Sequence, residues 1–175
     1  MALNFVMTCR KGSCAVKNEA YLQTMHQKIF IVGFMASGKT TWGKQLAEEK
    51  GLPFVDTDAL IEEKIGMSVK DFFAQWGEKY FRRMERDVLY AQLSKQESFV
   101  CATGGGSVCQ PDIMDWLNRA GETIWLDTPW EVILERLHQD TTRPLATSMS
   151  DEELKALYDL RCGYYGKAGK REVMR

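Results

Sequence analysis

Residues 33–40 read GFMASGKT and directly follow the apolar run IFIV at residues 29–32. The stretch has the spacing Gly-x-x-x-x-Gly-Lys-Ser/Thr, and a helical pattern begins at Lys39. A loop of this kind between a strand and a helix binds phosphate groups through its backbone amides and the helix N-terminus. Lys39 would reach the β- and γ-phosphates of a nucleoside triphosphate, and the Thr40 hydroxyl would bind Mg²⁺. The predicted phosphate-binding residues are Ala36, Ser37, Gly38, Lys39, Thr40 and Thr41.

Strand and helix patterns alternate along the chain on both sides of this loop. Alternation of this kind predicts an α/β fold, with a mostly parallel sheet covered by helices on both faces. Ligands of such sheets bind beyond the carboxyl ends of the strands. The predicted strands are 29–34, 53–56, 98–103 and 123–127, and the predicted helices are 39–50, 58–65, one from residue 68, 78–95, one near 111, one after 128 and one from 150.

Length, charge and cysteine content narrow the class of protein. A chain of 175 residues is typical of one domain. The net charge of -1 gives no electrostatic sign of a nucleic-acid partner, and no apolar run approaches the roughly 18 residues of a membrane span. Five scattered cysteines with only two histidines favour reduced thiols over a metal site. We therefore expect a cytoplasmic monomer with neither a nucleic-acid nor a membrane partner.

The first 28 residues differ from the rest of the chain. They show no helical or strand period, and they carry four basic residues against one acidic residue. Their apolar run ALNFVM is shorter than the core of a signal peptide, which needs about 7–15 residues. We predict a disordered N-terminal extension over residues 1–28, with the folded domain spanning 29–175.

Two aspartates follow the second predicted strand in the sequence VDTD. Residues two apart in extended backbone point to the same side, so the carboxylates of Asp56 and Asp58 are expected to face one site. A phosphoryl transferase needs a carboxylate near Mg²⁺ and a group that orients the acceptor hydroxyl or takes its proton. We assign Asp56 to the metal and Asp58 to the acceptor. The alternative for Asp58 is a structural cap on a helix beginning at Ala59.

Three arginines are candidates for binding anionic groups. Arg82 and Glu85 lie three residues apart on one predicted helix face, where the alternative is a solvated surface pair. Arg161 lies beside the apolar face of the last helix, and its planar guanidinium suits bidentate binding of a carboxylate. Arg143 lies in a polar stretch whose length is typical of a lid, from which it would stabilise a transferring phosphoryl group.

The ordered set GFMASGKTT, FVDTD, FRRMERD, TGGGSV, TRPL and RCGYY strongly resembles the shikimate kinase family over residues 29–165. This family of small P-loop kinases implies a three-layer α/β/α fold with a central parallel sheet of strand order 2-3-1-4-5. It also implies a lid at about residues 138–150. The implied activity is transfer of the ATP γ-phosphate to the 3-hydroxyl of shikimate, in aromatic amino-acid biosynthesis, with Mg²⁺ as cofactor.

The same resemblance implies a role for each matching residue. Lys39, Asp58 and Arg143 would be catalytic, with Asp58 the candidate base and Arg143 the lid arginine that also contacts ATP. Thr40 and Asp56 would handle Mg²⁺. The residues implied for shikimate are Asp58, Arg82, Glu85, Gly104, Gly105, Gly106 and Arg161, with Arg82 and Arg161 on the carboxylate and Glu85 orienting Arg82.

The three glycines at 104–106 follow a strand that the implied strand order places beside the phosphate loop. Because glycine has no side chain, we expect the shikimate ring to lie against bare backbone there, within reach of the γ-phosphate. The alternative is a flexible turn with no role in binding.

The sequence departs from the family pattern in three places. Ala36 replaces a usual glycine, which matters only where the backbone needs a positive φ, so we expect a minor effect. Residues 162–164 read CGY where the family usually has a Pro-Leu pair, and Gly163 would loosen the helix end that carries Arg161. After Tyr165 the sequence GKAGKREVMR is short for a last strand, an adenine loop and a final helix, so we expect the last strand to be reduced to EVMR.

Two other functions stay open on the sequence alone. One is a P-loop kinase for a different small acceptor, such as gluconate or a nucleoside monophosphate. The other is a non-catalytic or truncated nucleotide-binding protein, for which the short sequence after Tyr165 is the main support.

Overall fold

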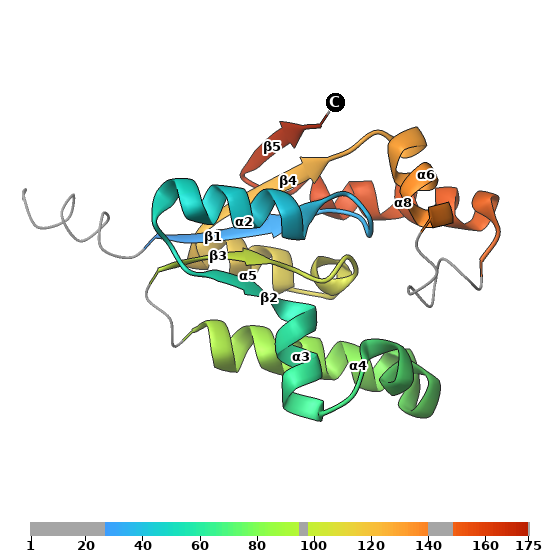
Figure 1. Ribbon diagram of the computed structural model, residues 1–175, viewed down its shortest axis with the longest axis horizontal. Helices are drawn as coiled ribbons and strands as arrows, with labels where there is room; N and C mark the ends of the chain where they lie inside the picture. The colour runs from blue at the N-terminus through green and yellow to red at the C-terminus, as the bar shows by residue number, and fades with distance from the viewer. Residues whose placement is uncertain (1–26, 95–97, 140–148, 175) are drawn as a thin grey trace, which may run out of the picture.

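The protein has one five-stranded sheet in the order β2-β3-β1-β4-β5, with every neighbouring pair parallel (Figure 1). The computed structural model describes residues 27–94, 98–139 and 149–174. The α/β class and the strand order 2-3-1-4-5 predicted from the sequence are confirmed. The strands are β1 (Lys28–Val32), β2 (Phe54–Asp56), β3 (Phe99–Ala102), β4 (Glu122–Asp127) and β5 (Lys170–Val173).

Helices cover both faces of this sheet, with α2 in front and α5 and α8 behind in the view of Figure 1. The helices are α2 (Lys39–Lys50), α3 (Thr57–Ile65), α4 (Val69–Leu93), α5 (Ile113–Ala120), α6 (Trp130–Gln139) and α8 (Asp151–Tyr165), with the short 3₁₀ helix η1 (Ser107–Cys109). The sequence SDEE at residues 150–153 predicts the start of α8 correctly, since Ser150 and Glu153 form a reciprocal capping box.

The central strand β1 explains how the core is divided. Its side chains alternate between two apolar clusters, with Ile29 and Ile31 in one and Phe30 and Val32 in the other. All four side chains are fully buried, as expected for the middle strand of a parallel sheet with helices on both faces. This strand leads directly into the phosphate loop, so the loop extends from a fully buried strand in the middle of the sheet.

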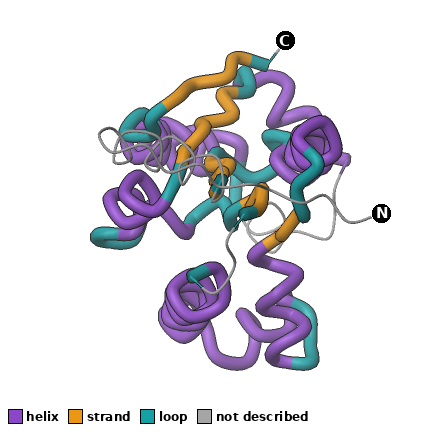
Figure 2. The backbone as a smooth tube through the Cα atoms, turned by 90° about the vertical axis from the view of Figure 1, so that its left-hand side faces the viewer, coloured by secondary structure: helices purple, strands orange, loops and turns teal. Residues whose placement is uncertain are grey.

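Helices α3 and α4 form a separate lobe beyond the β2 edge of the sheet (Figures 1 and 2). A third apolar cluster, built around Ile61, Phe72, Phe81 and Val88, holds this lobe together. Helix α4 is interrupted at Gly77, whose φ of 76° and ψ of 175° are not helical. The sequence prediction of two helices, one from residue 68 and one from residue 78, therefore matches the two halves of α4.

The last strand differs from its prediction. It begins at Lys170, two residues before the predicted EVMR, and it pairs with β4 over four residues. Arg171 lies over the Trp125 ring, 4.8 Å from the ring centroid, and forms an ion pair with Asp127. These cross-strand contacts hold β5, which is exposed along its length.

The first strand begins at Lys28, one residue before its predicted start. The predicted N-terminal extension lies outside the described residues, except for its last two positions. Within the described residues, no helix has the length and apolar character needed to cross a membrane.

Candidate active site

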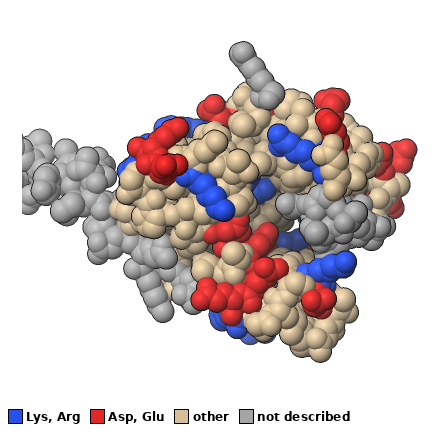
Figure 3. Space-filling model, viewed as in Figure 1, with Lys and Arg blue, Asp and Glu red and all other residues tan. Residues whose placement is uncertain are grey.

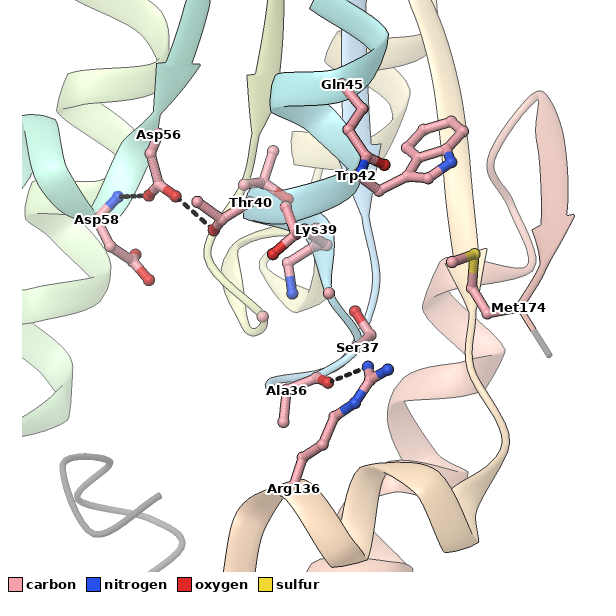
Figure 4. A pocket seen from close by; sticks show the side chains of 14 residues that line it. Ala36, Ser37, Lys39, Thr40, Trp42, Gln45, Asp56, Asp58, Arg136 and Met174 are labelled. Carbon is pink, nitrogen blue, oxygen red and sulfur yellow. Dashed lines mark hydrogen bonds between the residues drawn. The ribbon is translucent and has the colours of Figure 1, made fainter. Parts of the chain in front are cut away.

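The phosphate loop borders a cavity of about 500 Å³, called cavity 1 here (Figure 4). The loop is closed by a hydrogen bond from the Ser37 amide to the Phe34 carbonyl (3.3 Å), and α2 begins after Gly38, whose φ is 94°. Lys39 Nζ donates to the Phe34 carbonyl (2.7 Å) from the first position of α2. Cavity 1 is lined by Ala36, Ser37, Gly38, Lys39, Thr40, Thr41, Trp42, Gln45, Asp56, Asp58, Thr103, Gly105, Arg136 and Met174.

Two residues that the sequence analysis missed support the phosphate loop from outside. The Thr128 hydroxyl donates to the Ser37 carbonyl (2.9 Å), and Arg136 Nη1 donates to the Ala36 carbonyl (3.0 Å). Figure 4 shows Arg136 reaching up to the loop from α6. No motif marks Arg136, but its helix begins three residues after the carboxyl end of β4, where ligand-binding residues are expected.

The loop also contains a buried hydroxyl that suits a polar ligand. Ser37 is 1% exposed, and its Oγ has no hydrogen-bond partner among the described residues. Buried polar groups are almost always paired in native structures, so an unpaired one needs an explanation. A phosphate group in cavity 1 would supply the acceptor oxygens that this region of the loop lacks.

The minor effect expected for Ala36 assumed that the backbone needs no positive φ there, and the structure contradicts that assumption. The Ala36 backbone has a φ of 59°, in the left-handed region that glycine adopts readily and alanine does not. Glycine is usual at this position because it adopts a positive φ at little cost. Alanine at this position therefore strains the backbone of the phosphate loop.

Replacing Ala36 with glycine is expected to stabilise the protein by about 0.5–1 kcal/mol, because the relief of strain exceeds the added flexibility of the unfolded chain. For a chain of this size the melting temperature should rise by roughly 1–4 °C in thermal unfolding. The matched control is Ala91→Gly in α4, an exposed helical position, which should lower stability by about 1 kcal/mol. A lower melting temperature for both variants would contradict strain at Ala36.

The two aspartates of VDTD, Asp56 and Asp58, have different positions in the structure. Strand β2 ends at Asp56, and Asp58 lies in the first turn of α3 rather than in extended backbone. Asp56 Oδ1 accepts from the Asp58 amide (3.0 Å), so Asp56 is the helix cap, and the alternative of Asp58 as cap to a helix beginning at Ala59 is wrong. Both side chains nevertheless line cavity 1.

Thr40 and Asp56 are the residues that fit a metal ion. The Thr40 hydroxyl donates to Asp56 Oδ2 (2.8 Å) at the edge of cavity 1, as Figure 4 shows. A hydroxyl and a carboxylate are the oxygen ligands that Mg²⁺ prefers, and Mg²⁺ bound with a nucleotide takes its other ligands from phosphates and water. The described residues contain no group of three or more acidic, histidine or cysteine side chains placed for a metal ion.

A second, narrower cavity of about 100 Å³, called cavity 2 here, lies against α4 and α8. Asp58 and Gly105 line both cavities, so the two spaces meet at these residues. Cavity 2 is lined by Met35, Asp58, Val69, Phe73, Phe81, Arg82, Glu85, Gly104, Gly105, Gly106 and Arg161.

The Arg82–Glu85 pair is part of cavity 2 and not a solvated surface pair. Arg82 Nη1 donates to Glu85 Oε2 (2.5 Å), and Arg82 also pairs with Glu78 (3.0 Å). Burial alone would lower the pKa of the Arg82 guanidinium, but the charges and hydrogen bonds of Glu85 and Glu78 raise this pKa above its ordinary value. Glu85 is 1% exposed, so the arginine is held by a carboxylate that cannot turn toward water.

Two further residues that the sequence analysis missed hold Glu85. The Ser107 hydroxyl donates to Glu85 Oε1 (2.7 Å), and the Gln110 amide donates to Oε2 (3.4 Å). Both come from the segment just after the three glycines. The carboxylate is thus hydrogen-bonded on both oxygens, which a buried charge requires.

The three glycines leave space mainly for the side chains of the site itself. A Cβ atom at Gly104 would lie 2.5 Å from Glu85 Oε1 and 2.8 Å from Asp58 Oδ1, and one at Gly106 would lie 2.5 Å from Arg82 Nη2. Gly105 packs on the phosphate loop, where a Cβ would lie 3.0 Å from the Met35 amide nitrogen. The glycines line cavity 2 as expected, but they also allow the charged residues to pack against the backbone.

Arg161 reaches cavity 2 from the last turn but one of α8 and is 7% exposed. Its charge and that of Arg82 both act to lower the pKa of the Cys109 thiol, although burial dominates and raises that pKa. Arg82 and Arg161 therefore both place positive charge at cavity 2. Arg143 and residues 140–148 of the predicted lid lie outside the described residues.

On the face shown in Figure 3, acidic and basic side chains are interspersed, and neither sign covers the face. This agrees with the net charge of -1.

Comparison with known proteins gives a consistent result. The family model described as "Shikimate kinase" matches residues 35–175. A shikimate kinase from a Sulfurihydrogenibium species is 43% identical over 145 residues, covering 83% of this chain and 86% of that protein. One from Microcystis aeruginosa is 43% identical over 148 residues, covering 83% and 76%.

Solved structures agree with these sequence matches. The structure of shikimate kinase from Acinetobacter baumannii in complex with shikimate has a TM-score of 0.80 and 33% identity, covering 89% of this chain and 87% of that chain. The shikimate kinase from Bacteroides thetaiotaomicron has a TM-score of 0.74 and 33% identity, covering 83% and 85%.

Proposed function

The chain belongs to the shikimate kinase family, and from this premise we propose how its two cavities carry out the reaction. Its activity is phosphorylation of shikimate by ATP, a step of aromatic biosynthesis. The observation that best supports a transfer mechanism is that Asp58 lines both cavities, one bordered by the phosphate loop and one by two arginines. A group at that junction can contact donor and acceptor together.

Shikimate occupies cavity 2 with its carboxylate toward Arg82 and Arg161 in this proposal. Guanidinium groups bind a carboxylate through paired, charge-assisted hydrogen bonds, each stronger than a neutral one. The Glu85 carboxylate fixes Arg82 from the other side at 2.5 Å, so the arginine is held in place before the acceptor arrives. With the carboxylate at this end, the ring hydroxyls extend toward Asp58 and Gly105.

Asp58 acts on the 3-hydroxyl, which it orients and whose proton it accepts as phosphoryl transfer proceeds. The carboxylate belongs to the first turn of α3, and the hydrogen bond from the Asp58 amide to Asp56 fixes that turn. Asp56 caps the helix, and the Asp58 side chain lines both cavities, where it can contact the acceptor. Phosphoryl transfer depends mostly on such positioning and on charge stabilisation.

The residues of the phosphate loop, from Ala36 to Thr41, bind the ATP phosphates through backbone amides and the N-terminus of α2. Lys39 moves from the Phe34 carbonyl, which it contacts at 2.7 Å, to the β- and γ-phosphates. Thr40 and Asp56 would hold Mg²⁺, and the ion would supply positive charge that neutralises the phosphates. Arg143 contributes a further positive charge to the transferring group from the lid at about residues 138–150.

We also propose that the protein works as a monomer in the cytoplasm. Cys101, Cys109 and Cys162 are free thiols in the structure, which is typical of proteins kept in a reducing compartment. Neither a nucleic acid nor a membrane takes part in the reaction, whose partners are ATP and shikimate.

The proposed function is tested by ADP release with MgATP and a panel of acceptors: shikimate, quinate, gluconate and a nucleoside monophosphate. We expect turnover with shikimate, and ³¹P and ¹H NMR of the product should place the phosphate on the 3-hydroxyl. Turnover stimulated by another acceptor but not by shikimate would contradict the proposal. Binding of ATP and shikimate without turnover would instead indicate a non-catalytic protein.

A further inference from the structure

Arg161 differs from Arg82 in how its guanidinium is held. Arg82 pairs with the carboxylates of Glu78 and Glu85. Arg161 is 7% exposed, yet it forms no ion pair with a carboxylate within the part of the chain that the structure describes. A buried guanidinium needs partners that fix its orientation if it is to bind an anion precisely. The neighbouring aromatic residues supply them.

Phe34 contacts Arg161 from the phosphate loop. The guanidinium carbon of Arg161 lies 5.6 Å from the centroid of the Phe34 ring, within the range of a cation–π interaction. The ring is 1% exposed and meets Tyr158 edge-on at 5.4 Å, so it cannot turn away from the arginine. Phe34 is also the residue whose carbonyl accepts from Lys39.

Tyr165 lies four residues beyond Arg161 on α8, so the two side chains share one face of the helix. Its hydroxyl donates to the Gly105 carbonyl (2.5 Å), and its ring is fully buried. Burial raises the pKa of the phenol, while the nearby positive charge of Arg161 acts in the opposite direction. The phenol is therefore a neutral group that joins the arginine to the glycine segment.

We propose that Phe34 and Tyr165 are positioning residues that hold the Arg161 guanidinium in the geometry that binds the acceptor carboxylate. Each connects Arg161 to a different loop of the site: Phe34 to the phosphate loop and Tyr165, through Gly105, to the glycine segment. This inference rests on the proposed binding of the shikimate carboxylate by Arg161. Loss of either contact keeps the positive charge of Arg161 but leaves the orientation of its guanidinium less restricted.

The test compares shikimate with its carboxamide, which has the same ring without the negative charge, in the full chain with saturating MgATP. The quantity measured is the ratio of kcat/KM for the acid to kcat/KM for the amide. We expect Tyr165→Phe and Phe34→Leu each to lower this ratio by about 5- to 10-fold, because a charge-assisted hydrogen bond to the carboxylate is weakened. The KM for ATP should change by less than about twofold.

The matched control is Tyr164→Phe, which removes a phenol hydroxyl from the same helix. Tyr164 lines neither cavity, and its ring contacts Lys167, so the acid-to-amide ratio should stay as in the unmodified protein. Thermal unfolding of each variant separates positioning from stability. The proposal would be overturned if a folded Tyr165→Phe or Phe34→Leu variant lowered kcat/KM equally for shikimate and its amide, or lowered it for neither.

Two further results separate this proposal from its premise. Absence of turnover with shikimate in the unmodified protein contradicts the proposed function, and calorimetric binding of shikimate and its amide then replaces kinetics in the same comparison. Arg161→Lys should lower the acid-to-amide ratio by itself, and Tyr165→Phe should have little further effect in that background. Additive losses would show that Tyr165 acts independently of Arg161, which also overturns the proposal.

Discussion

Replacing Asp58 with asparagine is expected to lower kcat with shikimate by about 10²–10⁴-fold, because an amide cannot accept the proton of the acceptor hydroxyl. The substitution keeps the size and shape of the side chain at the junction of the two cavities. The KM for ATP should change little, since the proposed binding of the phosphates depends mainly on the backbone amides of the phosphate loop and on Lys39. Steady-state kinetics with each substrate varied in turn measures both quantities.

Asp71→Asn is the matched control for Asp58→Asn. Asp71 also lies in the first turn of a helix, α4, but it lines neither cavity. Both substitutions remove a negative charge near a helix N-terminus, which costs about 0.3–1 kcal/mol of stability. Similar melting temperatures together with a large kcat loss only in Asp58→Asn would support a chemical role. A loss of only a few-fold would leave Asp58 with positioning alone.

Most helices and strands were predictable because the sequence patterns that indicate them are local. The phosphate loop, the apolar runs and the capping box at Ser150 each depend on a few neighbouring residues. The resemblance of the ordered motifs supplied the strand order, which local patterns do not determine. Strand β5 was placed two residues too late because its four residues are all exposed, and its support comes from contacts of Arg171 with Trp125 and Asp127.

The predicted site residues that the structure describes line one or both of the two cavities, but their geometry was less predictable from the sequence. Whether Asp56 or Asp58 caps α3 depends on where the helix begins, and a two-residue shift of that start moves the cap from one aspartate to the other. The strain at Ala36 depends on a backbone φ that the residue type alone does not determine. Arg136, Ser107 and Tyr165 act through backbone carbonyls or a buried carboxylate far away in the sequence, so no spacing marks them.

Replacing Gly106 with alanine is expected to lower kcat/KM for shikimate by about 10²–10⁴-fold. The backbone at Gly106 has a φ of -107°, which alanine adopts without strain, so the effect comes from the side chain alone. Its Cβ would lie 2.5 Å from Nη2, 2.6 Å from Cζ and 2.7 Å from Nη1 of Arg82, too close for the guanidinium to stay. Displacing Arg82 removes two charge-assisted hydrogen bonds to the acceptor carboxylate, at about 1.5–3 kcal/mol each.

Two variants identify the cause of the loss in Gly106→Ala. Gly163→Ala adds the same methyl group to α8, where no atom lies within 4 Å of it, so kinetics should be unchanged and stability should rise by up to about 1 kcal/mol. Arg82→Lys keeps the charge but loses the planar fork, so the KM for shikimate should rise by roughly 10-fold. In the Arg82→Lys background, Gly106→Ala should cost far less than alone, because the group with which alanine collides is gone. If Gly106→Ala lowered kcat/KM as much in the Arg82→Lys background as it does alone, the methyl group would be blocking the acceptor itself. The glycine would then leave space for the ligand and not for the arginine.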